Sequence, residues 1–114
     1  MDTNFRTKKL RNIFNSDKDL QRKYSDRMAR KIKMRLAVMR SADTLAMVPK
    51  KRPDRCHMLK GNRSGQYAVD LVHPFRLVFE PNHDPIPRKE DGGIDAGQIT
   101  AVTIIGVVDY HWMH

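Results

Sequence analysis

The chain has 114 residues, which suffice for one domain with a small core that needs neither a disulfide nor a metal. It carries 22 Lys and Arg against 13 Asp and Glu, a net charge of +9. No apolar run approaches the roughly 20 residues that span a bilayer, and nothing resembles a signal peptide. A single cysteine, Cys56, excludes an internal disulfide. We therefore expect a cytoplasmic domain, in a reducing compartment, that does not enter a membrane.

The charge is unevenly distributed along the chain. Residues 1–63 hold 19 basic and 6 acidic side chains, whereas residues 64–114 hold 3 basic and 7 acidic ones. A strongly basic half joined to a mildly acidic half implies a polyanionic partner, nucleic acid before membrane.

Two helices are predicted in the first half. Apolar residues recur at helical spacing from Phe5 to Phe14, and residues 15–17 then supply a break and a cap for a second helix. Apolar residues recur every four positions from Leu20 to Leu36, so this helix should end between Arg40 and Val48. Its opposite face is basic and consists of Arg22, Lys23, Arg27, Arg30, Lys31, Lys33 and Arg35.

Strands are predicted in the second half. Residues 55–59, 66–71 and 75–79 have strand character, and the last two should form a hairpin. Residues 99–110 are apolar almost throughout, which is typical of a strand buried on both faces. The loop at 81–97 is long for a small domain and is therefore expected to be functional or partly mobile. The order predicts one α+β domain over 1–114, with a helical basic half (1–48) packed on a small twisted antiparallel sheet (55–111).

Standard catalytic motifs are missing from the sequence. It has no phosphate-binding loop, no dinucleotide-binding glycine pattern, no nucleophile elbow and no paired cysteines. His111 and His114 form a His-x-x-His pair, but no carboxylate or cysteine lies at ligand spacing from it. We therefore expect neither a metal nor a cofactor.

Two clusters, 57–67 and 109–111, carry residues suited to chemistry. If their strands are neighbours, a group of side chains converges: His57, Lys60, Arg63, Tyr67, Arg76, Asp109, Tyr110 and His111. Such a group can cleave RNA without a metal, because a base removes the 2′-OH proton, an acid protonates the leaving oxygen and cations stabilise the phosphorane. The structural alternatives remain open: a hydrogen-bonded surface histidine, core or rim tyrosines, a polar strand end and a solvated basic helix face.

Three segments together resemble a known family. The stretches 56–69, 73–79 and 108–111 are similar to the HigB-like killer proteins of the RelE/ParE superfamily of toxins from bacterial toxin–antitoxin systems. The shared pattern is L-K-G-x-R-x-G-x-[YW], then R-[LI]-x-F, then D-Y-H, in that order. The resemblance implies a RelE-like fold, two helices against a twisted antiparallel sheet, and an endoribonuclease that cleaves mRNA on the 70S ribosome.

The resemblance also implies roles for individual residues. Asp109 or His111 would activate the 2′-OH, and His57 would take the complementary proton role. Lys60 and Arg76 would neutralise the phosphorane, and Tyr110 would stack on or orient a base. Residues expected to contact RNA outside the chemical step are Arg63, Tyr67, Arg22, Lys23, Arg27, Arg30 and Lys31. For Arg63 and Tyr67 the first expectation is a structural role in the turn and the core, with Arg63 able to reach a phosphate.

The resemblance further implies partners. A cognate antitoxin, typically a helix-turn-helix protein similar to HigA, would neutralise the toxin, and operator DNA would be reached only through it. Three departures are visible. Asp70 stands where many relatives have a basic residue, the strand that commonly precedes the first helix should be short or absent, and the loop at 81–97 is longer than the simple hairpin of compact relatives. A gyrase-inhibiting toxin of the ParE type and a non-catalytic or decayed RNA-binding toxin are the alternative functions.

Overall fold

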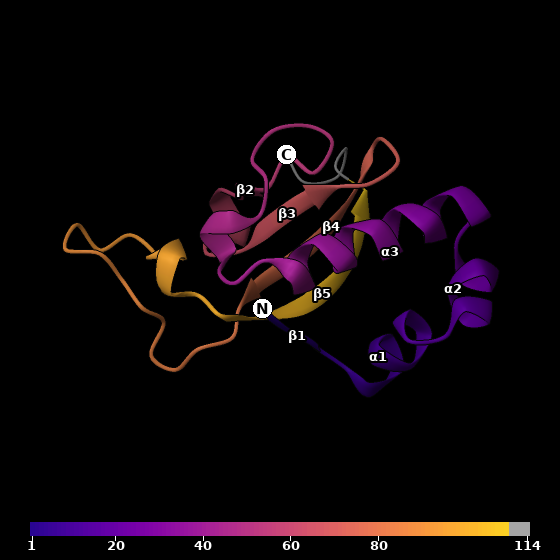
Figure 1. The fold of residues 1–114 in the computed structure, drawn as a ribbon, viewed down its shortest axis with the longest axis horizontal. Coiled ribbons are helices and arrows are strands. Elements are labelled where there is room, and N and C mark those ends of the chain that lie inside the picture. Colours follow the sequence, from indigo (N-terminus) through magenta and orange to yellow (C-terminus); the bar gives the residue numbers. More distant parts are fainter. Residues whose placement is uncertain (110–114) are drawn as a thin grey trace.

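The strands form one twisted sheet across the middle of the molecule (Figure 1). The computed structural model describes residues 1–109, and the strand order is β1-β5-β4-β3-β2. The strands are β1 (Asp2–Phe5), β2 (His57–Met58), β3 (Tyr67–Asp70), β4 (Phe75–Pro81) and β5 (Ala101–Asp109). The predicted strands and the β3–β4 hairpin are confirmed; β2, β3 and β5 are shorter than predicted, and β4 extends two residues further, to Pro81.

The sheet is mixed, so the prediction of an antiparallel sheet is wrong at one edge. The short strand β1 pairs in parallel with β5, with Asp2 opposite Ala101, while the other neighbours pair antiparallel. Parallel neighbours need a long connection between them, and here the helices and three other strands lie between β1 and β5 in the sequence. The N-terminal strand is therefore present but short.

Three helices precede the second strand: α1 (Lys8–Phe14), α2 (Asp17–Lys23) and α3 (Asp26–Ser41). The predicted second helix is thus two helices. Tyr24 is extended (ψ 167°), and the Ser25 hydroxyl accepts a hydrogen bond from the Met28 amide at 3.1 Å. This is the N-cap arrangement of a new helix, and it redirects the chain after α2.

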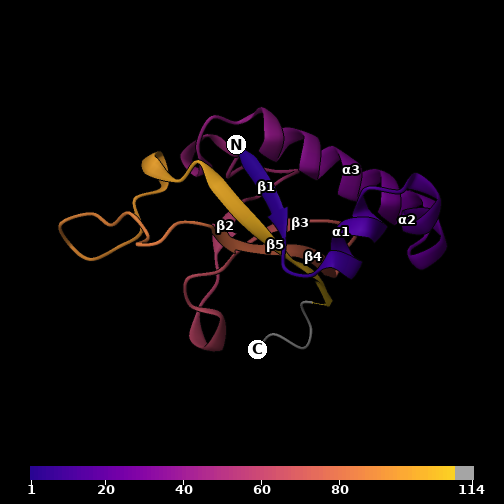
Figure 2. The same cartoon turned by 90° about the horizontal axis from the view of Figure 1, so that it is seen from below.

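The main core lies between α3 and one face of the sheet. Ile32, Leu36 and Met39 of α3 are buried in the same cluster as Leu77, Phe79 and other strand residues. The views in Figures 1 and 2 agree that α3 runs along the sheet, with α1 and α2 at one end of it. The α+β class and the packing of helices on the sheet are therefore confirmed.

Strand β5 is buried less completely than predicted. Val102 and Ile104 are fully buried on the α3 side, whereas Ile105, Val107 and Val108 are half-buried. Ile105 and Val108 pack instead on a small second cluster of Leu59, Ala68 and Val78. The expectation of full burial on both faces is wrong because no helix of the described chain covers this second face (Figure 2).

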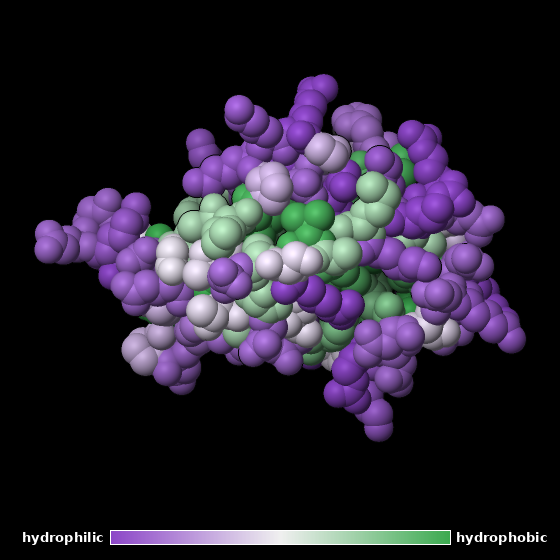
Figure 3. Space-filling model, in the orientation of Figure 1, coloured by the Kyte–Doolittle hydropathy of each residue, from purple (hydrophilic) through white to green (hydrophobic). Residues whose placement is uncertain are grey.

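The long loop projects from one end of the molecule (Figure 1). Its course is set by the bridge between Arg88 and Ile94, by the burial of Ile94, and by a turn of 3-10 helix at Ala96–Gln98. The loop is anchored at its base, where the Thr100 amide donates to His83 Nε2 at 3.0 Å. Polar side chains cover both ends of the long axis, and apolar ones show in the middle of the same face (Figure 3). No helix within residues 1–109 is long and apolar enough to cross a membrane.

Candidate active site

The β3–β4 hairpin places a carboxylate and a guanidinium side by side. Asp70 and Arg76 are opposite each other in the antiparallel register, so both side chains project from the same face of the sheet. Arg76 Nε lies 3.4 Å from Asp70 Oδ1. Ala68 and Val78, the next pair on this face, belong to the small second cluster, so the ion pair stands at the edge of an apolar floor.

His57 joins this pair from the neighbouring strand β2. Its Nε2 lies 2.9 Å from Arg76 Nη1, and its Nδ1 lies 2.7 Å from the carbonyl oxygen of Arg55. Arginine only donates hydrogen bonds and a carbonyl only accepts them. The geometry therefore defines a neutral imidazole with its proton on Nδ1 and its lone pair, at Nε2, turned towards Arg76.

Arg55 organises the site through both its backbone and its side chain. Its φ of 48° is left-handed, which is uncommon for a residue other than glycine and turns the carbonyl towards His57. Its Nε lies 2.7 Å from Asp70 Oδ2, and its Nη2 lies 3.3 Å from Oδ1. Asp70 therefore accepts from two arginines at once, and Arg55 holds His57 and Asp70 in one arrangement.

A buried arginine supports the segment that carries Arg55. Arg35 is only 3% exposed, its Nε donates to the Asp70 carbonyl at 2.6 Å, and it lies 3.7 Å from Asp54 Oδ1. The Asp70 amide in turn donates to the Asp54 carbonyl at 2.8 Å. The prediction that Arg35 belongs to the exposed basic face of its helix is therefore wrong, because its guanidinium satisfies buried carbonyl groups of the sheet and the adjoining loop.

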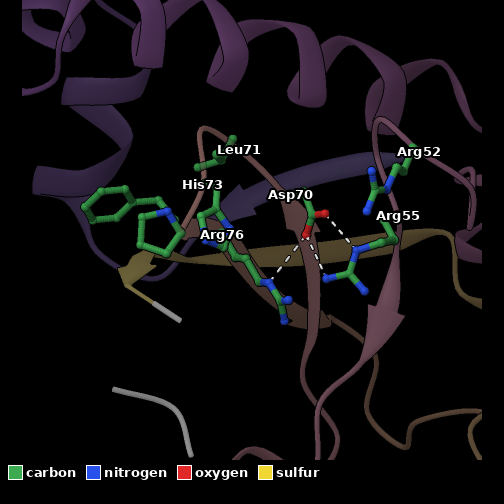
Figure 4. A pocket seen from close by; sticks show the side chains of 8 residues that line it. Arg52, Arg55, Asp70, Leu71, His73 and Arg76 are labelled. Carbon is green, nitrogen blue, oxygen red and sulfur yellow. Dashed lines mark hydrogen bonds and ion pairs between the residues drawn. The ribbon is translucent and has the colours of Figure 1, made fainter. Parts of the chain in front are cut away.

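Arg55, Asp70 and Arg76 border a cavity of about 520 Å³ (Figure 4). Arg52 and Arg55 lie on one side of Asp70, and Arg76 and His73 lie on the other. Three arginines facing one carboxylate make the cavity electropositive, so it is suited to an anion.

The structure brings together only part of the predicted site. Strands β2 and β5 are not neighbours, because β3 and β4 lie between them, and His57 meets Arg76 across β3. Asp109 is half-buried and opposite Phe75, at the same end of the sheet as Arg76. Tyr110 and His111 lie outside the described residues.

The turn after β2 is separate from this group. Lys60 is exposed and precedes a turn of 3-10 helix at Gly61–Arg63, and no hydrogen bond or ion pair within residues 1–109 joins it to His57 or Arg76. Arg63 Nη1 donates to the Gln66 side chain at 3.0 Å, which closes the turn. Lys60 and Arg63 thus lie at a turn connected to the site through β2 alone.

Tyr67 lies in the core. It is 7% exposed, and its ring stacks on Phe79 with the centroids 6.0 Å apart. Burial raises the pKa of its hydroxyl. The structure therefore gives Tyr67 the core role that was the alternative to RNA contact, because its ring offers no free face for a base.

The basic face of the helices remains largely as predicted. Arg22 and Lys23 on α2 and Arg27 and Arg30 on α3 are exposed, and Lys31 is half-buried. Helix α2 lies at the far end of the molecule from the long loop (Figure 1). These side chains are accessible to a polyanionic surface.

Three site residues were missed or undervalued in the sequence. Arg52 and Arg55 flank Pro53 and Asp54 in a segment without periodicity, and Asp70 was noted only as a departure from a family pattern. The one available signal was the strand register, because residues 70 and 76 are equidistant from a short turn and must therefore pair.

The described residues support neither a metal site nor a reactive cysteine. No three His, Cys, Asp or Glu side chains within residues 1–109 are grouped as ligands for a metal ion. Cys56 is buried, and burial raises the pKa of its thiol to about 11, with Asp54 raising it further and Lys50 opposing the shift. A thiol held in its protonated form is a poor nucleophile.

Fold and site together define an α+β domain with an arginine- and histidine-bearing site on the exposed face of its sheet. No protein-family model matches the chain, and no curated protein is similar enough to count as a relative. The assignment of a function therefore depends on the geometry of the site and on the sequence motifs.

Proposed function

We propose that this protein is the toxin of a type II toxin–antitoxin system, with a RelE-like fold, and that it cleaves mRNA on the ribosome without a metal. The single observation that carries the proposal is the contact between His57 and Arg76 next to Asp70 and Arg55. A proton-transfer group and phosphate-binding cations then share one face of the sheet. These are the groups that a 2′-OH attack requires.

The tautomer of His57 supports a role as the base. Because Nε2 carries the lone pair, it accepts the 2′-OH proton once an RNA phosphate draws the Arg76 guanidinium away. The 2′ oxygen then bonds to phosphorus, the bond to the 5′ oxygen breaks, and an acid returns a proton to that oxygen. The products are a 2′,3′-cyclic phosphate and a 5′-hydroxyl. This reverses the role first expected for His57 and leaves the acid to Asp109 or His111.

Charge at the reacting phosphorus is the second requirement. Arg76 is the cation in contact with the base, and its planar guanidinium matches two phosphate oxygens. Lys60, on the adjacent turn, supplies a further cation if RNA brings the turn and the hairpin together. Tyr110 keeps its proposed role in orienting a base.

The helical surface supports the choice of the ribosome as the site of action. Arg22, Lys23, Arg27 and Arg30 are exposed on neighbouring helices and do not line the cavity, so they can contact ribosomal RNA while the site receives mRNA. Such attachment is sensitive to salt and blind to sequence. A partner antitoxin with a helix-turn-helix, and operator DNA bound only through it, are part of the same proposal, as is a bacterial cytoplasmic location.

The test is cleavage of mRNA during translation in a reconstituted bacterial system, read by primer extension. Wild-type protein freed of antitoxin should cut ribosome-bound mRNA and leave naked mRNA intact. Arg76→Ala and His57→Ala should lose cleavage, whereas Arg6→Ala should keep it, because Arg6 is exposed and directly follows β1, at the opposite edge of the sheet from β2. Intact mRNA with wild-type protein on translating ribosomes would overturn the proposal.

One observation favours a second candidate, a non-catalytic RNA-binding toxin. Asp70 pairs with both Arg55 and Arg76 and thus offsets part of the charge that the phosphorane needs. This alternative predicts ribosome binding without cleavage, and expression without antitoxin that does not slow growth.

A further inference from the structure

The cavity beside Asp70 has a surplus of positive charge, which comes from the segment before β2 and from the β3–β4 hairpin. Arg52 and Arg55 come from the segment before β2, and Arg76 from β4 (Figure 4). Among the lining residues that the described part of the chain supplies, Asp70 is the single carboxylate. A cavity with two net positive charges is stabilised by a bound anion with about two negative charges. A singly charged group that has several acceptor oxygens, such as a phosphate diester, is also suited to it.

Arg52 is the least satisfied of the three cations. Its side chain is exposed and makes no hydrogen bond or ion pair with any residue of the described part of the chain, whereas Arg55 and Arg76 both contact Asp70. An arginine in this state keeps all five N–H donors for a ligand. The guanidinium matches phosphate better than any other cationic side chain, because its donors are planar and paired.

The backbone that follows Arg52 is held in place by hydrogen bonds. Asp54, two residues further on, is buried, and its backbone carbonyl accepts from the Asp70 amide. Arg35 donates to the carbonyls of Pro53 and Asp70, at 3.3 and 2.6 Å. The two residues that follow Arg52 are therefore held by hydrogen bonds from β3 and α3, so little backbone order is lost when a ligand binds.

The opposite rim of the cavity is apolar. Phe75 is a lining residue and 36% exposed, which makes it one of few large apolar side chains on the described surface. Pro74 precedes it in the same lining. An exposed aromatic ring beside a cationic pocket is the arrangement by which single-stranded nucleic acid is held, with the base on the ring and the phosphate on the cations.

We propose that this cavity is a nucleotide subsite, in which Arg52 and Arg55 bind an RNA phosphate next to the one that is cleaved and Phe75 stacks on its base. Arg76 lies between the two positions and contributes to both. The choice of RNA as the ligand rests on the proposed function, whereas the phosphate chemistry rests on the cavity alone. The subsite positions the strand and takes no part in the proton transfers.

The test is an NMR titration of the full chain with the dinucleotide ApA, which has one phosphate and two bases and few contacts with the basic helices. Amide signals of residues 52–55 and 71–76 should shift. Arg52→Gln should weaken binding by about tenfold, as expected for the loss of one charged hydrogen-bonding partner. The matched control is Arg88→Gln, an exposed arginine on the long loop at the other end of the molecule, which should bind as wild type does.

The second variant separates the base from the phosphate. Phe75→Leu should weaken ApA by about fivefold or more and leave inorganic phosphate unaffected, because stacking contributes about 1–3 kcal/mol per base. Equal effects of Phe75→Leu on both probes, or no difference between Arg52→Gln and Arg88→Gln, would overturn the subsite.

The two proposals fail separately. ApA binding that depends on Arg52, in a protein that leaves mRNA intact on ribosomes, supports the subsite and refutes the nuclease. Cleavage of ribosome-bound mRNA together with ApA binding that is indifferent to Arg52 refutes the subsite and supports the nuclease.

Discussion

Arg76 donates a hydrogen bond from Nη1 to Nε2 of His57 at 2.9 Å, and its own Nε faces Asp70 at 3.4 Å. One guanidinium therefore contacts the candidate base and a carboxylate through different nitrogens. Only a planar, multi-donor group can do this, so the geometry is specific to arginine.

Replacing Arg76 with lysine should abolish this double contact while keeping the charge. We expect the rate of ribosome-dependent mRNA cleavage to fall by about 10²–10³, the range seen when one preorganised electrostatic contact is removed. Single-turnover cleavage on stalled ribosomes measures the rate. Arg88→Lys is the control and should cleave as wild type does, and an Arg76→Lys rate within about twofold of wild type contradicts the role.

The tautomer of His57 can be observed directly. Long-range ¹H–¹⁵N NMR of the imidazole should show the proton on Nδ1, because that nitrogen donates to the Arg55 carbonyl at 2.7 Å. In Arg76→Ala the lone pair at Nε2 loses its donor, so the Nε2-protonated form should gain population. A wild-type spectrum with the proton on Nε2 would show that the assigned hydrogen bonds are wrong.

Asp70 should restrain the electropositive cavity. Asp70→Asn removes the carboxylate charge facing Arg55 and Arg76, so affinity for single-stranded RNA should rise by about three- to tenfold, with a steeper salt dependence. The free energy of unfolding should drop by about 1 kcal/mol or less, since Asp70 and Arg55 are 28% and 38% exposed and the pair is screened. Fluorescence anisotropy at two salt concentrations measures the affinity, and unchanged RNA affinity would contradict the prediction.

Helices and strands were predicted correctly from the sequence wherever a single sequence pattern determined the local structure. Alternation and turn residues defined the β3–β4 hairpin, and the apolar run at 99–110 defined β5. The break at Tyr24 was missed because apolar residues recur every four positions from Leu20 to Met28, without interruption at the break. The capping residue Ser25 lies between two of these apolar positions. The apolar periodicity favours one continuous helix and the Ser25 cap favours a new one, and the structure has the new helix.

The candidate site was less predictable because it depends on partners distant in sequence. His57 and Arg76 were identified from motifs, but their contact crosses a whole strand. Arg35 lies in a run of basic residues and differs from its neighbours only in facing the carbonyls of Pro53 and Asp70. Nothing local distinguishes a buried arginine from a solvated one, so long-range packing decides.

Arg35 should contribute strongly to stability. Arg35→Met leaves the Asp54 carboxylate buried without its cation, and Asp54 Oδ1 has no hydrogen-bond partner within the described residues. We expect a loss of about 3–5 kcal/mol in the free energy of unfolding, measured with urea. Adding Asp54→Asn should recover part of it, because the uncompensated charge is then gone. Arg27→Met, on the exposed face of the same helix, should change stability by less than about 0.5 kcal/mol, and an equal effect of the two single changes contradicts the role.

Cys56 should make stability fall with rising alkaline pH. The folded thiol has a pKa of about 11, raised by burial, while an exposed thiol in the unfolded chain titrates near 8.5–9. Below pH 8 both states keep the proton and the thiol contributes no pH dependence. Between pH 9 and 11 the unfolded chain loses its proton first, so unfolding is favoured as pH rises.

The matched comparison is Cys56→Ala, which lacks this titration and keeps the other ionisable groups. From pH 8 to pH 10 the wild type should lose about 1–2 kcal/mol more of its free energy of unfolding than the variant, measured with urea at each pH. Alkylation by iodoacetamide should be slow for the native protein at pH 8 and fast after unfolding, because the buried thiol is protonated and shielded. If the free energy of unfolding changes with pH equally in the two proteins, the pKa of Cys56 is not raised by folding. Rapid alkylation of the native protein would show that the thiol is accessible.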